Sequence, residues 1–92
     1  MEKWKGKIAV VTGSSSGIGY DVFQELIKHD VITIGLDIFP EKTEKLINEQ
    51  NLKGFAYKCD VGNQAEVEEV FKKIEEKFGS VNILINNAGI GR

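Results

Sequence analysis

The sequence Thr12-Gly13-Ser14-Ser15-Ser16-Gly17-Ile18-Gly19 separates two segments of different hydrophobic periodicity. Before it, residues 7–12 form a short apolar run typical of a buried strand, and after it apolar residues recur at helical spacing. A glycine-rich turn between a strand and a helix lets backbone N–H groups and the helix N-terminus face a phosphate. The turn is not a P-loop, because it contains no lysine, and its glycines do not follow G-x-G-x-x-G. It therefore predicts a strand–turn–helix unit that binds a phosphate-bearing ligand.

Outward from this turn, apolar runs alternate with helical patterns along the whole chain. Strands are predicted over residues 7–12, 31–36, 54–59 and 81–85, and helices from residue 18, over 41–50 and through 67–78. Such alternation favours parallel strands joined by right-handed crossovers. The sequence thus predicts a three-layer α/β fold, with a partial parallel sheet in the order 3-2-1-4 and helices on both faces.

The spacing of apolar residues also predicts the buried face of each helix. The inward residues of the first helix are Ile18, Val22, Phe23, Leu26 and Ile27; those of the second are Leu46 and Ile47; those of the third are Val67, Val70, Phe71, Ile74 and Phe78. The many Glu and Lys residues over 66–77 form the solvated face of the third helix, which Gly79 ends.

Composition excludes several classes of partner and site. The 92 residues carry a formal charge of -2, so no basic surface for nucleic acid or an anionic membrane is expected. One cysteine and one histidine cannot build a disulfide framework or complete a zinc site. No apolar run approaches the ~20 residues of a membrane span, and residues 8–11 are too few for a signal-peptide core. These features predict a cytoplasmic protein without a metal.

Asp37 is the candidate ligand for a ribose. It ends the second predicted strand, 18 residues after Gly19, close to the ~20-residue separation expected for a carboxylate that binds the ribose hydroxyls of a dinucleotide. Its charge would repel a 2′-phosphate by about 1–4 kcal/mol at ~4 Å, and Ile38 and Ser16 offer no compensating cation. The sequence therefore favours NAD over NADP. The alternatives are a solvated surface aspartate, and a ligand-free turn with a serine helix cap.

At these residues the chain resembles the short-chain dehydrogenase/reductase family. Residues 12–19 have the form of the family's T-G-x-x-x-G-I-G loop, Asp60-Val61 is similar to its adenine-contacting pair, and Asn86-Asn87-Ala88-Gly89 matches N-N-A-G. Trp4 and Gly6-Lys7 are similar to some insect members that act on isoprenoid or related alcohols. The resemblance implies a Rossmann-type fold in which residues 1–92 are the N-terminal, dinucleotide-binding part of a single domain.

The resemblance also implies an NAD-dependent oxidoreductase that moves hydride between the nicotinamide and an alcohol or carbonyl substrate, and a homo-oligomer for a complete chain. The family's catalytic Ser and Tyr-x-x-x-Lys follow N-N-A-G, whereas Tyr20 and Tyr57 have Gln24 and Val61 four residues on. No catalytic residue is therefore assigned, and the 92 residues alone are expected to be inactive. The alternatives are a truncated, non-enzymatic fragment that binds a nucleotide or associates with other chains, and a flavodoxin-like or receiver domain.

The resemblance places the pyrophosphate over the glycine-rich turn, the ribose at Asp37, and the adenosine beside Asp60, Val61 and Asn87. Asp60 has a second interpretation as a helix cap, and Asn86 is expected to tie strands together. The predicted cofactor-binding residues are Gly13, Ser14, Ser15, Ser16, Gly17, Ile18, Gly19, Asp37, Ile38, Asp60, Val61, Asn87, Ala88 and Gly89.

Overall fold

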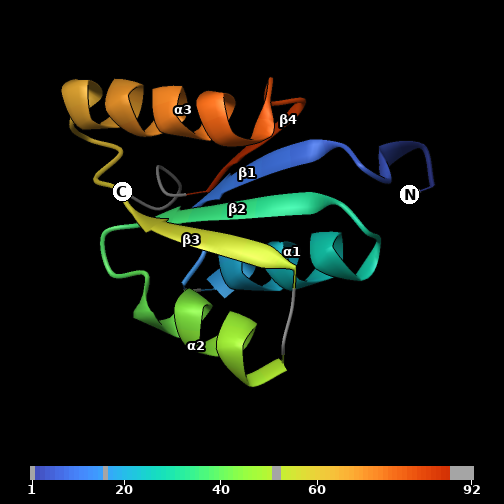
Figure 1. Ribbon diagram of the computed structural model, residues 1–92. Coiled ribbons are helices and arrows are strands. Elements are labelled where there is room, and N and C mark those ends of the chain that lie inside the picture. The colour runs from blue at the N-terminus through green and yellow to red at the C-terminus, as the bar shows by residue number, and fades with distance from the viewer. Residues whose placement is uncertain (1, 16, 51–52, 88–92) are drawn as a thin grey trace.

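Four parallel strands form one sheet in the computed structural model, which describes residues 2–15, 17–50 and 53–87. The strands are β1 (Ile8–Thr12), β2 (Ile32–Asp37), β3 (Gly54–Lys58) and β4 (Ile83–Asn86), and their order is β3-β2-β1-β4 (Figure 1). The helices are α1 (Gly17–Lys28), α2 (Glu41–Gln50) and α3 (Gln64–Phe78), preceded by a short 3-10 helix, Glu2–Trp4. The predicted α/β fold and its strand order 3-2-1-4 are confirmed.

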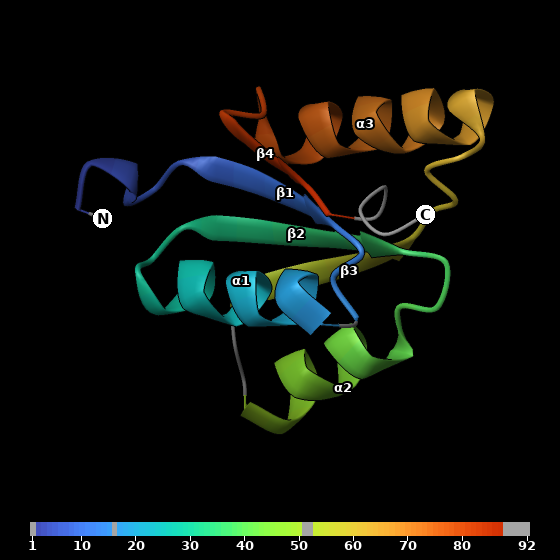
Figure 2. The same cartoon turned by 180° about the vertical axis from the view of Figure 1, so that it is seen from behind.

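The helices cover both faces of the sheet. Helices α1 and α2 lie on one face and α3 on the other, as the two opposite views show (Figures 1 and 2). Strand β1 is buried throughout: Ile8 and Val10 belong to the core cluster that Ile74 of α3 joins, whereas Ala9 and Val11 pack with Leu26 of α1. Burial on both faces explains the continuous apolar run that predicted this strand.

The face toward α1 has room for the ring of Phe23, which is fully buried. Two strand glycines leave this room: a Cβ at Gly35 of β2 would lie 3.2 Å from the ring, and one at Gly54 of β3 would lie 3.0 Å from it. Larger residues at these positions would displace the ring. The two glycines therefore let α1 pack closely on the sheet.

One predicted core residue is wrong, and some strand ends differ. Ile18 is 67% exposed, because it lies in the first turn of α1, at the carboxyl end of the sheet and before the part of the helix that packs on the sheet. Strand β3 ends at Lys58, and β4 begins at Ile83. Before β4, the Asn82 side chain accepts a hydrogen bond from the Ile8 N–H at 2.9 Å, in place of a regular ladder bond.

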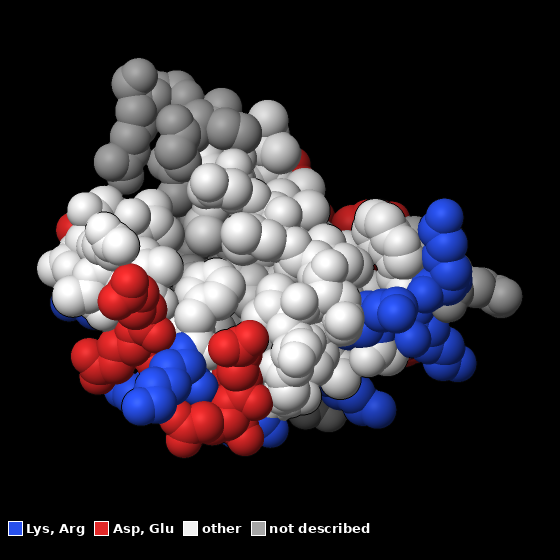
Figure 3. Space-filling view, turned by 90° about the horizontal axis from the view of Figure 1, so that it is seen from above, with Lys and Arg blue, Asp and Glu red and all other residues white. Residues whose placement is uncertain are grey.

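Strand β4 lies at one edge of the sheet, and its α3 side is poorly covered. Leu84 is 54% exposed and borders a hollow of about 160 Å³ with Val61, Val67 and Phe71. The face seen from the α3 side has an uncharged centre, with charged side chains gathered on either side of it (Figure 3). In the described ranges no helix combines the length and the apolar character needed to cross a membrane.

Candidate functional site

The glycine-rich turn is tightly packed at one glycine and open at another. A Cβ at Gly19 would meet the carbonyl oxygen of Gly13 and come within 2.6 Å of Asn87 Nδ2. A Cβ at Gly17 would meet nothing within 4 Å, and Gly17 has a φ of +52°, a region that favours glycine. Helix α1 begins at Gly17 and has no acidic residue in its first turn. The turn thus leaves an open cradle at a helix N-terminus, where an anion binds favourably.

Two serines of the turn bind a residue of α2 that the sequence analysis did not select. Ser14 Oγ lies 3.1 Å and Ser15 Oγ 2.7 Å from Thr43 Oγ1, and both Ser14 and Thr43 are fully buried. Thr43 could have been noticed as a polar residue one turn before Leu46, on the apolar face of its helix. Its partners, however, lie 28 and 29 residues away in the chain, beyond any local pattern.

Asp37 joins the turn to the loop that follows β2. Its Oδ2 accepts a hydrogen bond from the Ser15 N–H at 3.0 Å, and its Oδ1 accepts one from the Phe39 N–H at 3.0 Å. The carboxylate is half-buried at the end of β2, beside Ile38, which is also half-buried, and Phe39 is 71% exposed. Each carboxylate oxygen has further lone pairs that could accept a hydrogen bond from a ribose hydroxyl.

The end of β4 is bonded to the end of β1. Thr12 Oγ1 donates to Asn86 Oδ1 at 3.0 Å and accepts from the Asn87 N–H at 2.9 Å. Asn87 Nδ2 donates to the Gly13 carbonyl at 3.3 Å, so its side chain is attached to the glycine-rich turn. The predicted site residues Ser16, Ala88 and Gly89 lie outside the described residues.

Asp60 and Val61 form the turn between β3 and α3. Asp60 Oδ1 accepts from the Gly62 N–H at 2.9 Å, and the Asp60 N–H donates to Glu66 Oε1 at 3.0 Å. The N-cap of α3 is Asn63, whose side chain accepts from the Glu66 N–H, so the helix-cap interpretation of Asp60 is wrong. Asp60 and Val61 are both half-buried.

Just before this turn, Cys59 is 1% exposed. Burial raises the pKa of its thiol, and the nearby carboxylates of Glu66 and Asp60 raise it further. A buried thiol that keeps its proton is a poor nucleophile. Cys59 is therefore a core residue.

The four strands are parallel, so the described site residues come together at the carboxyl end of the sheet. Ligands of open α/β sheets bind at this end. The arrangement offers backbone donors and a helix N-terminus for a pyrophosphate, and a carboxylate for a ribose. The Lys42 ammonium lies over the Tyr20 ring, 4.2 Å from its centroid, as a cation–π contact.

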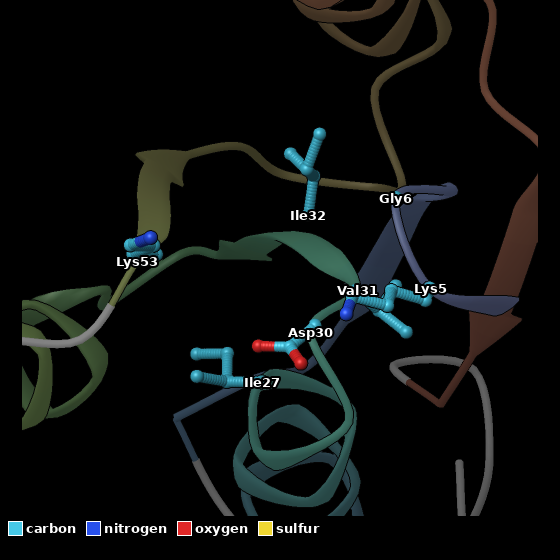
Figure 4. Close-up of a pocket in the computed structure, with 7 residues that line it drawn as sticks. All are labelled: Lys5, Gly6, Ile27, Asp30, Val31, Ile32 and Lys53. Atoms are coloured by element: carbon cyan, nitrogen blue, oxygen red, sulfur yellow. The ribbon is translucent and has the colours of Figure 1, made fainter. Parts of the chain in front are cut away.

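A larger hollow lies at the opposite end of the sheet, at the amino ends of the strands. It has a volume of about 550 Å³ and is lined by residues at the amino ends of β1, β2 and β3, with Asp30 between Lys5 and Lys53 (Figure 4). Its other lining residues include Ile27 and Val31. Because it lies at the amino ends of the strands, it is separate from the glycine-rich turn and Asp37.

Comparison with known proteins agrees with this geometry. The sequence profile of the family described as short chain dehydrogenase matches residues 7–92. The farnesol dehydrogenase of Aedes aegypti is 44% identical over 100% of this chain, which covers 39% of that protein. A yeast protein named "Probable NADP-dependent mannitol dehydrogenase", from Yarrowia lipolytica, is 42% identical over 98% of this chain and 34% of its own length.

The structural comparison gives the same result. A crystal structure of hydroxysteroid dehydrogenase from Escherichia coli superposes with a TM-score of 0.86 at 28% identity, over 97% of this chain and 39% of that one. The chain therefore spans well under half the length of the relatives it matches. The match over residues 7–92, with the parallel sheet and the glycine-rich turn before α1, means that this chain belongs to the short-chain dehydrogenase/reductase family, a family of oxidoreductases with a Rossmann-type fold.

Proposed function

We propose that this chain binds NAD at the carboxyl edge of its sheet, as the dinucleotide-binding part of an oxidoreductase that acts on an alcohol or carbonyl substrate. The observation that carries the proposal is the hydrogen bond from the Ser15 N–H to Asp37 Oδ2. It couples the turn that would face the pyrophosphate to the carboxylate that would face the ribose.

Each part of the dinucleotide has a candidate partner in the chain. The backbone N–H groups at the start of α1, around Gly17 and Ile18, would face the pyrophosphate, where Gly17 leaves open space. Asp37 would accept hydrogen bonds from the ribose hydroxyls. Val61 and Asn87 would border the adenosine. The nicotinamide supplies the hydride chemistry when it is bound, and the protein contributes binding and orientation.

The preference for NAD is proposed on electrostatic grounds. The Asp37 carboxylate is half-buried, so its repulsion of a 2′-phosphate is less screened than that of a fully exposed charge. Two lysines lie nearby: Lys58 pairs in register with Asp37 on β3, and Lys42 stands one residue before Thr43. Neither is bonded to Asp37 by an ion pair in the described structure. The preference for NAD therefore rests on the charge of Asp37, which these lysines do not neutralise through an ion pair in the described structure.

A second candidate function is a non-catalytic protein that binds a nucleotide or associates with other chains. The 92 residues contain no Tyr-x-x-x-Lys, but they span only 39% of the Aedes aegypti relative, so this absence favours neither candidate. The coding sequence downstream of Arg92 separates the two candidates: an in-frame Ser and Tyr-x-x-x-Lys supports the oxidoreductase, and an immediate stop codon supports the binding protein.

The proposed cofactor site is tested with two glycine variants in the protein as it occurs naturally. Gly17 and Gly6 both have positive φ, +52° and +79°, and a Cβ at either meets nothing within 4 Å, so valine strains the backbone at both. Only Gly17 lies in the glycine-rich turn, whereas Gly6 lies at the opposite end of the sheet, before the amino end of β1. We expect calorimetry to show that Gly17→Val abolishes NAD binding and Gly6→Val leaves it intact. Wild-type affinity in Gly17→Val would refute the site.

A further inference from the structure

Thr43 is buried beneath the glycine-rich turn and bonded to it three times. Its Oγ1 lies 3.1 Å from Ser14 Oγ and 2.7 Å from Ser15 Oγ, and its N–H donates to Ser15 Oγ at 3.4 Å. The first four N–H groups of a helix lack partners within the helix, so Ser15 caps α2 from a different part of the chain. The turn and the first turn of α2 are thus joined by side-chain hydroxyls.

Ser15 is held from two sides. Its N–H donates to Asp37 Oδ2 at the end of β2, while its hydroxyl contacts Thr43 at the start of α2. Ser14 is also fixed, because its side chain is fully buried and a Cβ at the neighbouring Gly35 would collide with Ser14 Oγ. Ser14 is too deeply buried to bind a ligand with its side chain, and two contacts to Thr43 hold the hydroxyl of Ser15 in place.

We propose that Thr43 is a positioning residue for the dinucleotide. Its hydroxyl holds Ser14 and Ser15 in place, and through them it sets where the open part of the turn, from Gly17 onward, presents its N–H groups to the pyrophosphate. Thr43 has no exposed surface, so its side chain would not touch a bound cofactor. The inference rests on the proposed function, and it changes the role of Ser14 and Ser15 from contacting the cofactor to shaping its site.

A purely structural role for Thr43 makes a different prediction. If the hydroxyl only anchored α2, its loss would lower stability and weaken every ligand equally. If it positions the turn, its loss weakens ligands that carry the pyrophosphate and spares those that lack it. Adenosine provides that comparison, because it retains the ribose and the base but has no phosphate.

The test uses Thr43→Val, which removes the hydroxyl at nearly constant shape, and Thr43→Ser, which keeps it, in the protein as it occurs naturally. Affinities for NAD and adenosine are measured below the unfolding temperature of every variant. We expect Thr43→Val to raise the Kd for NAD about five- to tenfold, the equivalent of about one net hydrogen bond. The Kd for adenosine should stay within about twofold of wild type, and Thr43→Ser should restore NAD binding.

The outcomes are distinct. Wild-type NAD affinity in Thr43→Val, or an equal loss for NAD and adenosine, overturns the positioning role. Failure of the wild-type protein itself to bind NAD overturns the proposed function instead. If Thr43→Val does not fold, Ser14→Ala removes a hydroxyl that is fully buried and bonded to Thr43 from the turn side, and the same NAD-specific loss is required of it.

Discussion

Asp37 accepts hydrogen bonds from two backbone segments, and this double role shapes what its substitution should do. Its oxygens bind the N–H groups of Ser15 and Phe39. Removing the carboxylate leaves both donors without that acceptor and loosens the turn, so affinity for either dinucleotide should fall. Removing the charge also ends its repulsion of a 2′-phosphate. The two effects separate in the ratio of affinities, because only the second distinguishes NADP from NAD.

We therefore expect Asp37→Ala to narrow the preference for NAD over NADP by at least about fivefold, since a like-charge pair at ~4 Å costs ~1 kcal/mol even in water. The measurement is the pair of dissociation constants in the protein as it occurs naturally. Asp21→Ala serves as the control, because Asp21 is exposed on α1 and its substitution removes the same formal charge. An unchanged ratio in Asp37→Ala would mean that Asp37 does not face the ribose and serves only to bind the N–H groups of Ser15 and Phe39.

Cys59 should give the fold a measurable dependence on alkaline pH. Burial raises the pKa of its thiol, so the folded chain holds that proton more tightly than the unfolded chain. The resulting contribution to stability is complete below the ordinary thiol pKa of about 8.5 and is lost as the pH rises through the raised pKa.

This pH dependence is tested by thermal unfolding of the wild type and Cys59→Ala between about pH 7 and pH 10, a range that spans the ordinary thiol pKa. Above about pH 8.5, the melting temperature of the wild type should fall more steeply with pH than that of Cys59→Ala. The two proteins share all their other ionisable groups, so the difference between the two curves isolates the thiol. Parallel curves would contradict the assignment of Cys59 as a buried thiol.

At the scale of elements, α3 depends on its N-cap. Asn63 accepts the Glu66 N–H at 3.1 Å, while the Glu66 carboxylate accepts the Asp60 N–H. The cap thus fixes both the start of the helix and the turn after β3. Ile74 lies on the same helix and is fully buried in the core cluster that also contains Ile8 and Val10.

Asn63→Ala should lower the free energy of unfolding by about 1 kcal/mol, the usual cost of losing such a cap. In a domain of this size that is a fall in melting temperature of about 4–8 °C. Asn63→Asp keeps an acceptor and places a negative charge at the helix N-terminus, so it should retain wild-type stability. Equal melting temperatures for Asn63→Ala and the wild type would show that the Asn63 cap does not stabilise the protein.

Elements were predictable where one local pattern sufficed. The run over residues 8–11 identifies β1 because both of its faces are buried, and Gly79 ends α3 by donating its N–H to the Glu75 carbonyl. The prediction that Ile18 is a core residue is wrong because helical spacing does not tell which turn of the helix reaches the sheet. Thr43 was missed because its hydroxyl is satisfied only by residues brought close through the fold.

The candidate site could be predicted only in part for the same reason. Motif spacing selects the glycine-rich turn and Asp37, and the sheet brings them to one edge. Spacing does not reveal that the Ser15 N–H bonds to the Asp37 carboxylate, nor that Asn87 binds the Gly13 carbonyl. Contacts between residues more than 20 positions apart depend on strand register and crossover geometry.

At the scale of the whole molecule, the weak point is the β4 edge. Strand β4 pairs with β1 on one side only, and Leu84 is 54% exposed above a hollow bordered by Val67 and Phe71. Fully burying one such side chain contributes ~1.5–3 kcal/mol, a large part of the ~5–15 kcal/mol that stabilises a typical domain. An unpaired strand edge is also a template for pairing with another chain.

We accordingly expect the 92-residue chain by itself to aggregate, dimerise through β4 or stay partly unfolded, and to bind NAD weakly. Sedimentation velocity and thermal unfolding of the purified chain measure this. Leu84→Lys should reduce association, because it removes apolar surface beside the open edge and adds charge there. Phe39→Lys is the matched control: Phe39 is 71% exposed but lies after β2, so its replacement should leave association unchanged. A stable, cooperative monomer with micromolar NAD affinity would contradict the prediction, and would mean that four strands and three helices suffice to bind the dinucleotide.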